Sequence, residues 1–569
     1  MKMKKCFFQF MFMLILLIFC NIFFIYSANA TDYILYSGDS SNQTNAQDKT
    51  GAPIPLNPYD SFTIESGAGI DIPSSSSNHT AIQSSSNSKI NNYGSITINT
   101  VGSTVYGIDA TDSNFIYNYG TINITSPLMV AEFNICGINA TDSNSIYNYG
   151  TIKITTSGNL SKGNIYGIYA VDNNFIYNYG SITCNIVNRR LENVYGIRVS
   201  SYNTIYNYGD VVIKVNNKDW GGVIYNFEIK YHNTIYNYGK ILNTINGVGP
   251  NHGDFFVFCV AASNYNTIYN YGTISTTINK SHNADVYGLQ FYDNNRIFNY
   301  GTISAAANES VEGRVYGVSL HDSNIFINGG SITARARENR DENKAYGIYV
   351  DGDDNTITNS GSIKAYGKTS YAIYIRRNNN VLNLEKGCSL HGDTADLGLE
   401  GTATTINLSG QRYYITYDGI DPTVKAPGLL VVQERDGNLD GQANGLIASV
   451  DPKNLPFSSS EAQTVGTGQA LHSVLFGRMK AGGNSWWTTG YGNVIYRKDN
   501  DSDAQGIVAG IDKKVGFLKR LGFFVGLNWA NSQEEDSLWE VKSRGYTLGT
   551  YAEAKFNKLS SGFVLSYGK

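Results

Sequence analysis

Charged side chains are scarce in this sequence. Lysine, arginine, aspartate and glutamate make up 16% of its 569 residues, whereas ordinary soluble domains contain roughly 25%. The 43 basic and 47 acidic residues nearly cancel, which excludes a strongly basic nucleic-acid-binding protein. Only ten prolines are present, so a collagen-like or proline-rich rod is excluded as well.

Long apolar runs are equally scarce, and the one clear example lies at the N-terminus. Three lysines precede an apolar run from Cys6 to Tyr26, and Ala28-Asn29-Ala30 follows it. This order is typical of a secretory signal peptide. We therefore expect residues 1–30 to be removed on export, leaving a mature start near Thr31. The alternative is an uncleaved membrane anchor, because the run is long enough to span a bilayer.

Glycine, tyrosine and neutral polar residues are abundant instead. The sequence contains 59 glycines and 42 tyrosines, and 41% of its residues are hydrophobic. The hydrophobic content excludes wholesale disorder, and the glycine and tyrosine content favours a turn-rich, all-β chain.

A repeat fills the middle of the sequence. Its clearest copy is the segment from Phe115 to Ile122, FIYNYGTI, and the glycine of this segment recurs at intervals of 26 to 33 residues. Such a period is typical of a solenoid. The recurring glycines are Gly94, Gly120, Gly150, Gly180, Gly209, Gly239, Gly272, Gly301, Gly330 and Gly361.

A second element, Tyr-Gly, fixes two strands and the turn between them. Tyr106 precedes Ile116 by ten residues, and the same spacing recurs in later repeats. The segment before each Tyr-Gly varies in length, from 12 residues between Gly94 and Tyr106 to 19 residues between Gly239 and Phe258. We therefore expect the length variation to lie at one corner of the solenoid.

The alternation within each repeat predicts short strands of a right-handed parallel β-helix. Ile116 and Asn118 would face the core and Tyr117 would face solvent. Adjacent coils would pair through backbone hydrogen bonds about 4.8 Å apart, which aligns identical residues vertically. We predict a structural amide ladder that joins Asn118 to Asn148 and an aromatic stripe that joins Tyr117 to Tyr147.

The cysteines fit this register. Cys136 occupies the tyrosine position of its repeat and Cys259 the glycine position, four coils later. Four coils span roughly 19 Å, which is beyond the reach of a disulfide. We expect unpaired, packed thiols at Cys136, Cys184, Cys259 and Cys388.

The repeat pattern decays after Ile363. Two weaker segments, 381–387 and 405–410, are predicted as terminal coils, so the β-helical domain spans residues 31–410. Residues 411–456 contain four prolines and are predicted to form a junction and capping segment, because an uncapped end would expose a sheet edge.

Residues 457–569 have a different character, with four of the five tryptophans. Apolar residues alternate from Leu521 to Ala530 and again from Tyr546 to Phe556, a pattern typical of outer-membrane barrel strands. We predict five such strands. Before them, helical spacing predicts a slender helix lying in a pore, with Ala470, Leu471, Val474 and Leu475 on one side.

Together these features resemble a monomeric autotransporter of the type V secretion class. The resemblance rests on the N-terminal signal, the tandem Ile-x-Asn-x-Gly-Thr/Ser-Ile repeats, Ala448-Ser449-Val450-Asp451-Pro452, and the segments Gly506 to Asp512 and Gly522 to Asn528. It implies Sec export, insertion of a C-terminal barrel into outer-membrane lipid by the assembly machinery, and passage of the β-helical passenger to the cell surface. Folding of the passenger outside the cell would bias its movement across the membrane in the outward direction.

The sequence departs from this family at its C-terminal end. Family barrels have twelve strands and end in an aromatic assembly signal, whereas we predict about five strands before Gly568-Lys569. An open sheet in lipid is prohibitive, so a truncated product or a fragment is expected. Self-cleaving members use paired asparagines in the pore helix, and no asparagine pair lies between Pro456 and Met479.

Sequence motifs for catalysis or metal binding are weak. Gly38-Asp39-Ser40 resembles the nucleophile block of GDS-type esterases, but Ser41 replaces the expected leucine. Neither of two acidic segments, 351–356 and 499–504, has the glycine of a calcium loop, so both are read as solvated turns. The histidines do not pair at metal-ligand spacing; they are His79, His232, His252, His282, His321, His391 and His472.

We therefore assign no catalytic, cofactor-binding or metal-binding residue. A small basic cluster, comprising Arg335, Arg337, Arg340 and Lys344, is interleaved with acidic residues, which argues against a polyanion groove. The leading functional prediction is a non-enzymatic autotransporter passenger, adhesive or structural, whose faces contact host glycans or proteins. The alternatives are a β-helix carbohydrate-active enzyme and a non-functional remnant.

Overall fold

The computed structural model describes a β-structure in two units. The first is a solenoid that extends to Ala448, apart from residues 428–430, and the second comprises residues 428–430 and the chain from Ser449 onward. The described residues are 31–36, 54–72, 78–99, 104–127, 133–158, 163–188, 193–216, 223–247, 255–279, 281–308, 310–337, 343–411, 413–427, 429–434, 444–450, 475, 485–497, 500–515, 518–533, 540–556 and 559–568.

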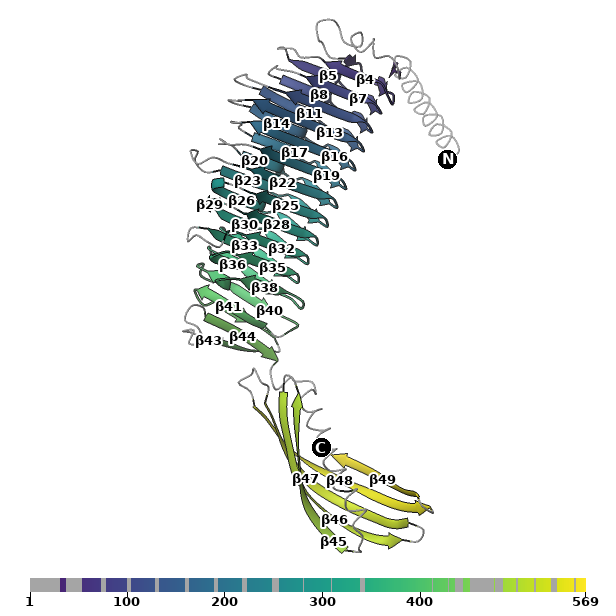
Figure 1. Cartoon of the computed structure of the whole chain (residues 1–569), viewed down its shortest axis with the longest axis vertical. Helices are drawn as coiled ribbons and strands as arrows, with labels where there is room; N and C mark the ends of the chain where they lie inside the picture. The colour runs from purple at the N-terminus through teal and green to yellow at the C-terminus, as the bar shows by residue number, and fades with distance from the viewer. Residues whose placement is uncertain are drawn as a thin grey trace, which may run out of the picture. The chain divides into compact units, whose positions relative to one another are not determined.

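Three parallel sheets wind around the core of the solenoid (Figure 1). We call them sheets A, B and C. A typical coil passes from a sheet B strand to a short sheet A strand, turns into sheet C, and crosses a loop of variable length to the next sheet B strand. The parallel β-helix predicted from the repeat is confirmed, with the length variation at the corner between sheets C and B.

Sheet A contains the Ile-Tyr-Asn segments. Its strands are β1 (Asp32–Leu35), β3 (Ser61–Ile64), β6 (Lys89–Asn92), β9 (Phe115–Asn118), β12 (Ser145–Asn148), β15 (Phe175–Asn178), β18 (Thr204–Asn207), β21 (Thr234–Asn237), β24 (Thr267–Asn270), β27 (Arg296–Asn299), β31 (Ile325–Asn328), β34 (Thr356–Asn359), β37 (Val381–Leu384), β40 (Thr405–Leu408) and β42 (Thr423–Lys425).

Sheet C follows the glycine turns. Its strands are β4 (Gly69–Ile72), β7 (Ser95–Asn99), β10 (Thr121–Ser126), β13 (Thr151–Gly158), β16 (Ser181–Asn188), β19 (Asp210–Asn216), β22 (Lys240–Asn246), β25 (Thr273–Ile278), β28 (Thr302–Ala307), β32 (Ser331–Arg335), β35 (Ser362–Tyr366) and β38 (Ser389–Gly392).

Sheet B contains the Tyr-Gly segments. Its parallel strands are β2 (Ile54–Leu56), β5 (His79–Ser84), β8 (Thr104–Thr111), β11 (Phe133–Thr141), β14 (Gly163–Ala170), β17 (Asn193–Ser201), β20 (Val223–Tyr231), β23 (Phe255–Ala262), β26 (Ser281–Phe291), β30 (Arg314–Leu320), β33 (Lys344–Val350), β36 (Thr369–Ile375), β39 (Ala395–Leu399) and β41 (Tyr413–Gly419). The short β29 (Ser310–Glu312) pairs with the start of β26.

The register places identical residues above one another. Ile146 pairs with Ile116 below it and Ile176 above it, and all three side chains are fully buried. Each coil alone cannot close its apolar interior, so stacking of the isoleucines on those of the neighbouring coil forms one continuous core.

Asparagine side chains form two ladders inside this core. The predicted ladder is confirmed: the Nδ2 of Asn118 donates to the Oδ1 of Asn148 at 2.7 Å, and Asn148 donates to Asn178 at 2.7 Å. A second ladder, which we did not predict, runs through the residue before each sheet A strand, with Asn114 donating to Asn144 at 3.0 Å. Both ladders satisfy buried polar groups that would otherwise be costly.

The end of the solenoid changes strand direction. Within the segment 411–456, β41 pairs in parallel with β39 and antiparallel with β44 (Asn444–Val450). The segment also contains β42 of sheet A and β43 (Leu429–Glu434). An antiparallel partner covers hydrogen-bonding groups that the last parallel strand would otherwise expose.

The second unit contains a five-stranded antiparallel sheet, as predicted. Its strands are β45 (Ser485–Arg497), β46 (Asn500–Val515), β47 (Leu518–Gln533), β48 (Glu540–Phe556) and β49 (Leu559–Gly568). Leu475 packs against Val508, Phe524 and Tyr551 of this sheet. It is the one described residue of the predicted pore helix, and the predicted signal peptide, residues 1–30, lies outside the described residues. Among the described residues, no helix has the length and apolarity to cross a membrane.

Candidate functional site

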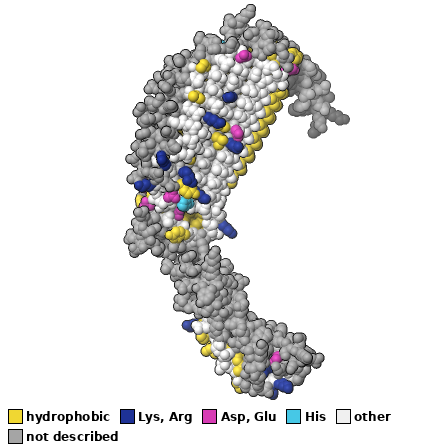
Figure 2. All heavy atoms as spheres, viewed as in Figure 1, with side chains coloured by type: hydrophobic (Ala, Val, Ile, Leu, Met, Phe, Trp, Pro, Cys, Tyr) yellow, Lys and Arg dark blue, Asp and Glu magenta, His cyan; other side chains and the backbone are white. Residues whose placement is uncertain are grey.

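Two tyrosine ladders run along sheet A and its turns into sheet C. The rings of Tyr117 and Tyr147 lie 4.8 Å apart, nearly parallel, which confirms the predicted stripe. An outer ladder is more exposed, and a row of hydrophobic side chains lines one edge of the solenoid in Figure 2. The outer ladder comprises Tyr93, Tyr119, Tyr149, Tyr179, Tyr208, Tyr238, Tyr271 and Tyr300.

The stacking geometry decides what these ladders can bind. Each interior ring is covered on both faces by its neighbours, for example Tyr149 between Tyr119 and Tyr179. Only edges and hydroxyls reach solvent, whereas a sugar stacks on an open ring face. The ladders therefore have the structural role that we predicted for them.

A third aromatic column lies on sheet B. A side chain added at Gly317 would meet Ile332 of sheet C, so this position faces the core and the preceding Tyr316 faces the other side of the sheet. The column is stacked but largely buried, and it comprises Tyr166, Tyr195, Tyr225, Phe258, Tyr287, Tyr316 and Tyr346.

Cations occupy two places along this column. At the first, the Arg198 guanidinium lies 4.9 Å from the centre of the Tyr195 ring and forms an ion pair with Glu228. This guanidinium is satisfied within the protein, because its neighbour on the next strand supplies the opposite charge.

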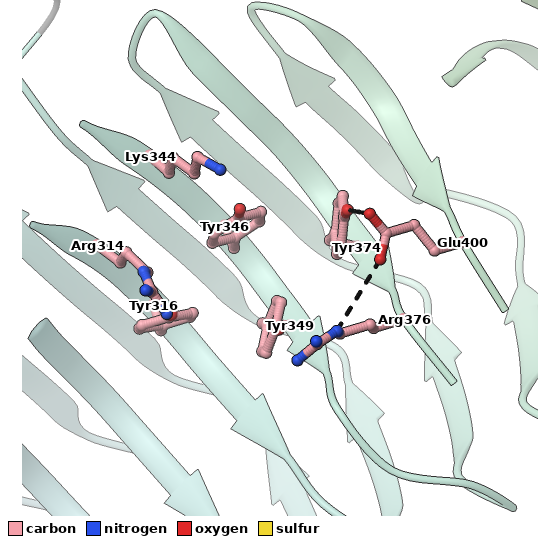
Figure 3. A pocket seen from close by; sticks show the side chains of 8 residues that line it. All are labelled: Arg314, Tyr316, Lys344, Tyr346, Tyr349, Tyr374, Arg376 and Glu400. Carbon is pink, nitrogen blue, oxygen red and sulfur yellow. Dashed lines mark hydrogen bonds and ion pairs between the residues drawn. The ribbon is translucent and has the colours of Figure 1, made fainter. Parts of the chain in front are cut away.

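The second place is a pocket of about 280 Å³ toward the C-terminal end of the solenoid, where Figure 2 shows charged side chains among hydrophobic ones. Three cations, four tyrosines and one carboxylate line it (Figure 3). The lining residues are Arg314, Lys344, Arg376, Tyr316, Tyr346, Tyr349, Tyr374 and Glu400.

The parallel register assembles this pocket. Arg314 of β30 pairs with Lys344 of β33, and Tyr316 pairs with Tyr346 two residues further along. On the next coil Tyr374 of β36 lies beside Tyr349. Arg376 and Glu400 directly follow β36 and β39.

The tyrosine rings of the pocket have two orientations. Tyr316 and Tyr346 continue the stacked column, at 16° to one another. Tyr349 is edge-on to Tyr316 at 61°, and Tyr374 is edge-on to Tyr346 at 62°, as Figure 3 shows. The main column continues from Tyr346 to Tyr371 at 9°, and Tyr349 and Tyr374 form a second stacked pair at 12° that stands across it.

The polar groups of the pocket are mostly donors. Nη1 of Arg376 donates to Oδ1 of Asp351 at 3.1 Å, and the Tyr374 hydroxyl donates to Glu400. Burial raises the pKa of Tyr346 to about 12 and also raises the pKa of Tyr316. Both phenols therefore keep their protons at neutral pH and remain hydrogen-bond donors.

The acidic segment at 351–356 does not form a calcium loop. Asp351 binds Arg376, Asp353 accepts a hydrogen bond from the backbone of Asn378 at 2.7 Å, and Asn355 belongs to the second asparagine ladder. Across the described residues, no group of three or more His, Cys, Asp or Glu side chains is placed to hold a metal ion. Residue 499 and the side chains of Asp501 and Asp503 lie outside the described residues, as does the motif 38–40.

Cys136 occupies a position in the aromatic column of sheet B. Cys136 pairs with Tyr106 and Tyr166, which confirms its place in the tyrosine position, and all four predicted thiols are unpaired. Burial raises the pKa of Cys184 and Cys259 to about 12, so these thiols are poor nucleophiles at neutral pH.

Histidines stack with tyrosines at two places in the described solenoid, and one of them pairs His321 with Tyr292. His232 lies between Tyr202 and Tyr265, 5.0 Å and 5.2 Å from their ring centres.

Most of the pocket was not identified from the sequence. Only Lys344 appears in a predicted cluster. Arg335 of the same cluster lies over the Tyr366 ring at 4.5 Å and does not line the pocket. A signal was present: Arg314 and Lys344 each stand two residues before a column tyrosine. Comparisons of the chain with family models, curated proteins and solved structures found no match.

Proposed function

We propose that this chain is an autotransporter-type protein, with an exported β-helical passenger that acts as a surface adhesin or structural element. The sheet of β45–β49 would lie in the outer membrane and residues 31–410 would be displayed outside. The predicted signal peptide at residues 1–30 supports export through Sec. Display would require the outer-membrane assembly machinery.

One observation carries the membrane part of the proposal: the C-terminal sheet exposes a continuous apolar face. Along β47, exposed and buried residues alternate strictly from Leu521 to Leu527, and Leu527 is 63% exposed. The exposed side chains of this strand and its neighbours are Ile507, Ile511, Leu521, Phe523, Val525, Leu527, Trp529, Tyr546 and Leu548. A water-soluble sheet would bury such a face, whereas a lipid-facing sheet exposes it.

The opposite face supports the same assignment. Asp512, Arg520 and Glu553 are buried there, and the Tyr551 hydroxyl donates to Asp512. Outer-membrane strands alternate between an apolar lipid side and a polar interior, which is the distribution seen here.

A substitution on the apolar face tests the membrane assignment. Leu527→Arg places a charge among the lipid-facing residues, which costs about 2–4 kcal/mol near the bilayer midplane. We expect less chain in the outer-membrane fraction. Val187→Arg is the matched control, because Val187 is 51% exposed on the solenoid and should tolerate the charge. Equal membrane recovery of the two variants would contradict the assignment.

Protease treatment of intact cells tests display. Added protease should digest the solenoid while a periplasmic marker stays intact. Protection of the solenoid until the outer membrane is permeabilised would contradict surface display and favour the non-functional remnant.

A second candidate, a β-helix carbohydrate-active enzyme, is favoured by one feature: the pocket contains a carboxylate, Glu400, beside Arg376. Hydrolysis by the common glycosidase mechanism needs two carboxylates, and Glu400 alone lines this pocket. The test is to incubate acidic and neutral polysaccharides with the protein and with Glu400→Gln. Chain shortening that the variant abolishes would favour the enzyme over the adhesin.

A further inference from the structure

We infer that the pocket on sheet B binds an acidic sugar, an oligosaccharide that carries a carboxylate or sulfate group. This inference rests on the adhesive part of the proposed function and names its ligand class. The pocket combines adjacent cations, phenolic donors and two partly exposed tyrosines around one partly open volume.

The positive charge is concentrated at one end of the pocket. Arg314 and Lys344 are register partners on adjacent parallel strands, so their backbones lie about 4.8 Å apart. Both side chains are exposed, and Arg314 also donates a hydrogen bond to the Tyr316 hydroxyl and interacts electrostatically with Asp285, which together raise the pKa of its guanidinium. An anionic group placed between Arg314 and Lys344 would attract both cations.

The hydrogen-bonding capacity of the pocket also matches an anion. Arg314, Lys344 and the protonated phenols of Tyr316 and Tyr346 supply donors. The single lining carboxylate, Glu400, already accepts from Tyr374. An acceptor-rich ligand therefore complements this wall better than a cationic or purely apolar one.

Other features select a sugar over a bare anion. Tyr349 and Tyr374 are partly exposed. Their rings stack on one another with centres 5.7 Å apart and stand edge-on to the buried column, so the exposed part of this pair borders the pocket that it lines (Figure 3). A volume of about 280 Å³ lies just below the usual range for ligand sites, about 300–1,000 Å³, and suits a short ligand. The carboxylate of Glu400 retains lone pairs that can accept from sugar hydroxyls.

The experiment is calorimetric titration of the full chain in detergent with defined trisaccharides. The ligands are a galacturonate trimer, a sulfated galactose trimer, a neutral galactose trimer and inorganic sulfate. We expect one or both acidic trimers to bind, with affinity that falls as salt concentration rises. Binding of the neutral trimer with equal affinity, or of inorganic sulfate with the affinity of the trimers, would overturn the inference.

Three variants locate the binding to the pocket. Lys344→Gln should weaken the acidic trimer at least about tenfold, because a charge-assisted hydrogen bond is lost. Tyr349→Ala should weaken both acidic trimers but leave the weak binding of inorganic sulfate unchanged. The matched control is Lys153→Gln, which removes the same charge from an exposed position on sheet C and should bind as the wild type does.

The outcomes separate this inference from the proposed function. A chain that is displayed on cells but binds neither acidic trimer retains the proposed display and loses the ligand assignment. A chain that binds the acidic trimer in detergent but is protected from protease on cells retains the ligand and loses surface display. Equal weakening by Lys344→Gln and Lys153→Gln would show non-specific electrostatics and overturn the assignment of the site.

Discussion

Asn178 illustrates how a polar side chain stabilises the interior of the solenoid. Its amide is fully buried, accepts from Asn148 and donates to Asn207 at 2.7 Å. Asn178→Ala removes both hydrogen bonds. The amides of Asn148 and Asn207 then each lose a partner inside the core, at a cost of about 1–3 kcal/mol for each unsatisfied group. We expect a clear fall in the denaturant midpoint, measured by circular dichroism on the full chain.

The control is the same substitution in another asparagine ladder, one that lies on the solvent-exposed side of the solenoid. Asn246 also bonds the asparagines above and below it, Asn279 and Asn216, but it is exposed. Water replaces its partners after Asn246→Ala, so the loss should stay below about 0.5 kcal/mol. Equal losses in the two variants would show that burial does not set the strength of the ladders.

The buried tyrosines make stability sensitive to alkali. The pKa of Tyr346 rises from 10.0 to about 12 because burial disfavours the phenolate. The folded state therefore holds this proton more tightly than the unfolded state. The resulting stability is fully present below about pH 10 and is lost as pH rises toward 12.

Melting temperatures between about pH 8 and pH 12 test this coupling. We expect a decline above pH 10 that is less steep in Tyr346→Phe, because phenylalanine has no proton to lose. The aromatic column tolerates such a ring, since Phe258 already occupies an equivalent position. Parallel curves for wild type and variant would contradict the prediction.

At the scale of the element, the glycine turn between sheets A and C sets how closely coils approach. A Cβ on Gly330 would lie 2.1 Å from the backbone oxygen of Gly301, whereas a Cβ on the adjacent Gly329 would have its nearest contact at 3.2 Å, with the Tyr300 ring. Backbone atoms of a stacked coil cannot move aside singly, but an exposed ring can shift.

Two alanine substitutions in this one turn should therefore differ sharply. Gly330→Ala should destabilise the solenoid by at least about 2 kcal/mol, and Gly329→Ala by less than about 1 kcal/mol. Chemical denaturation of both variants gives the comparison. A mild effect of Gly330→Ala would mean that the coils can separate locally to admit a methyl group.

At the scale of the whole molecule, the two units each have their own strand pairing. The solenoid closes through the antiparallel pairing of β41 with β44, and β45–β49 pair among themselves. Nearest-neighbour contacts stabilise a solenoid, so we expect its folding to be independent of the second unit. We predict that residues 31–450 fold alone.

Purified 31–450 should give a strand-rich spectrum and melt as the solenoid does in the full chain. A matched fragment that stops at residue 411 lacks β41 and β44 and should aggregate, because its last coil exposes hydrogen-bonding edges. An unfolded 31–450 fragment would show that the second unit is needed for folding.

The sequence alone determined the repeat, the β-helical coil that each repeat forms, the ladder through Asn118 and the position of Cys136. When successive coils have the same length, residues one period apart must lie above one another. The sequence did not reveal the second ladder. The residue before each asparagine of the second ladder has a positive φ, near 60° at Ser113 and Ser143. This left-handed backbone conformation breaks the alternation from which inward-facing side chains are predicted.

The pocket depended on tertiary structure for a related reason. Its residues come from four successive coils, and Arg314 and Glu400 are 86 positions apart in the sequence. Arg376 and Glu400 follow strands in coils whose lengths depart from the main period, so no fixed spacing joins them. Periodicity predicts contacts between residues a fixed number of positions apart, whereas the register partners of this pocket are 30 positions apart at Arg314 and Lys344 and 25 positions apart at Tyr349 and Tyr374. The pocket therefore becomes visible only after the coils have set their register.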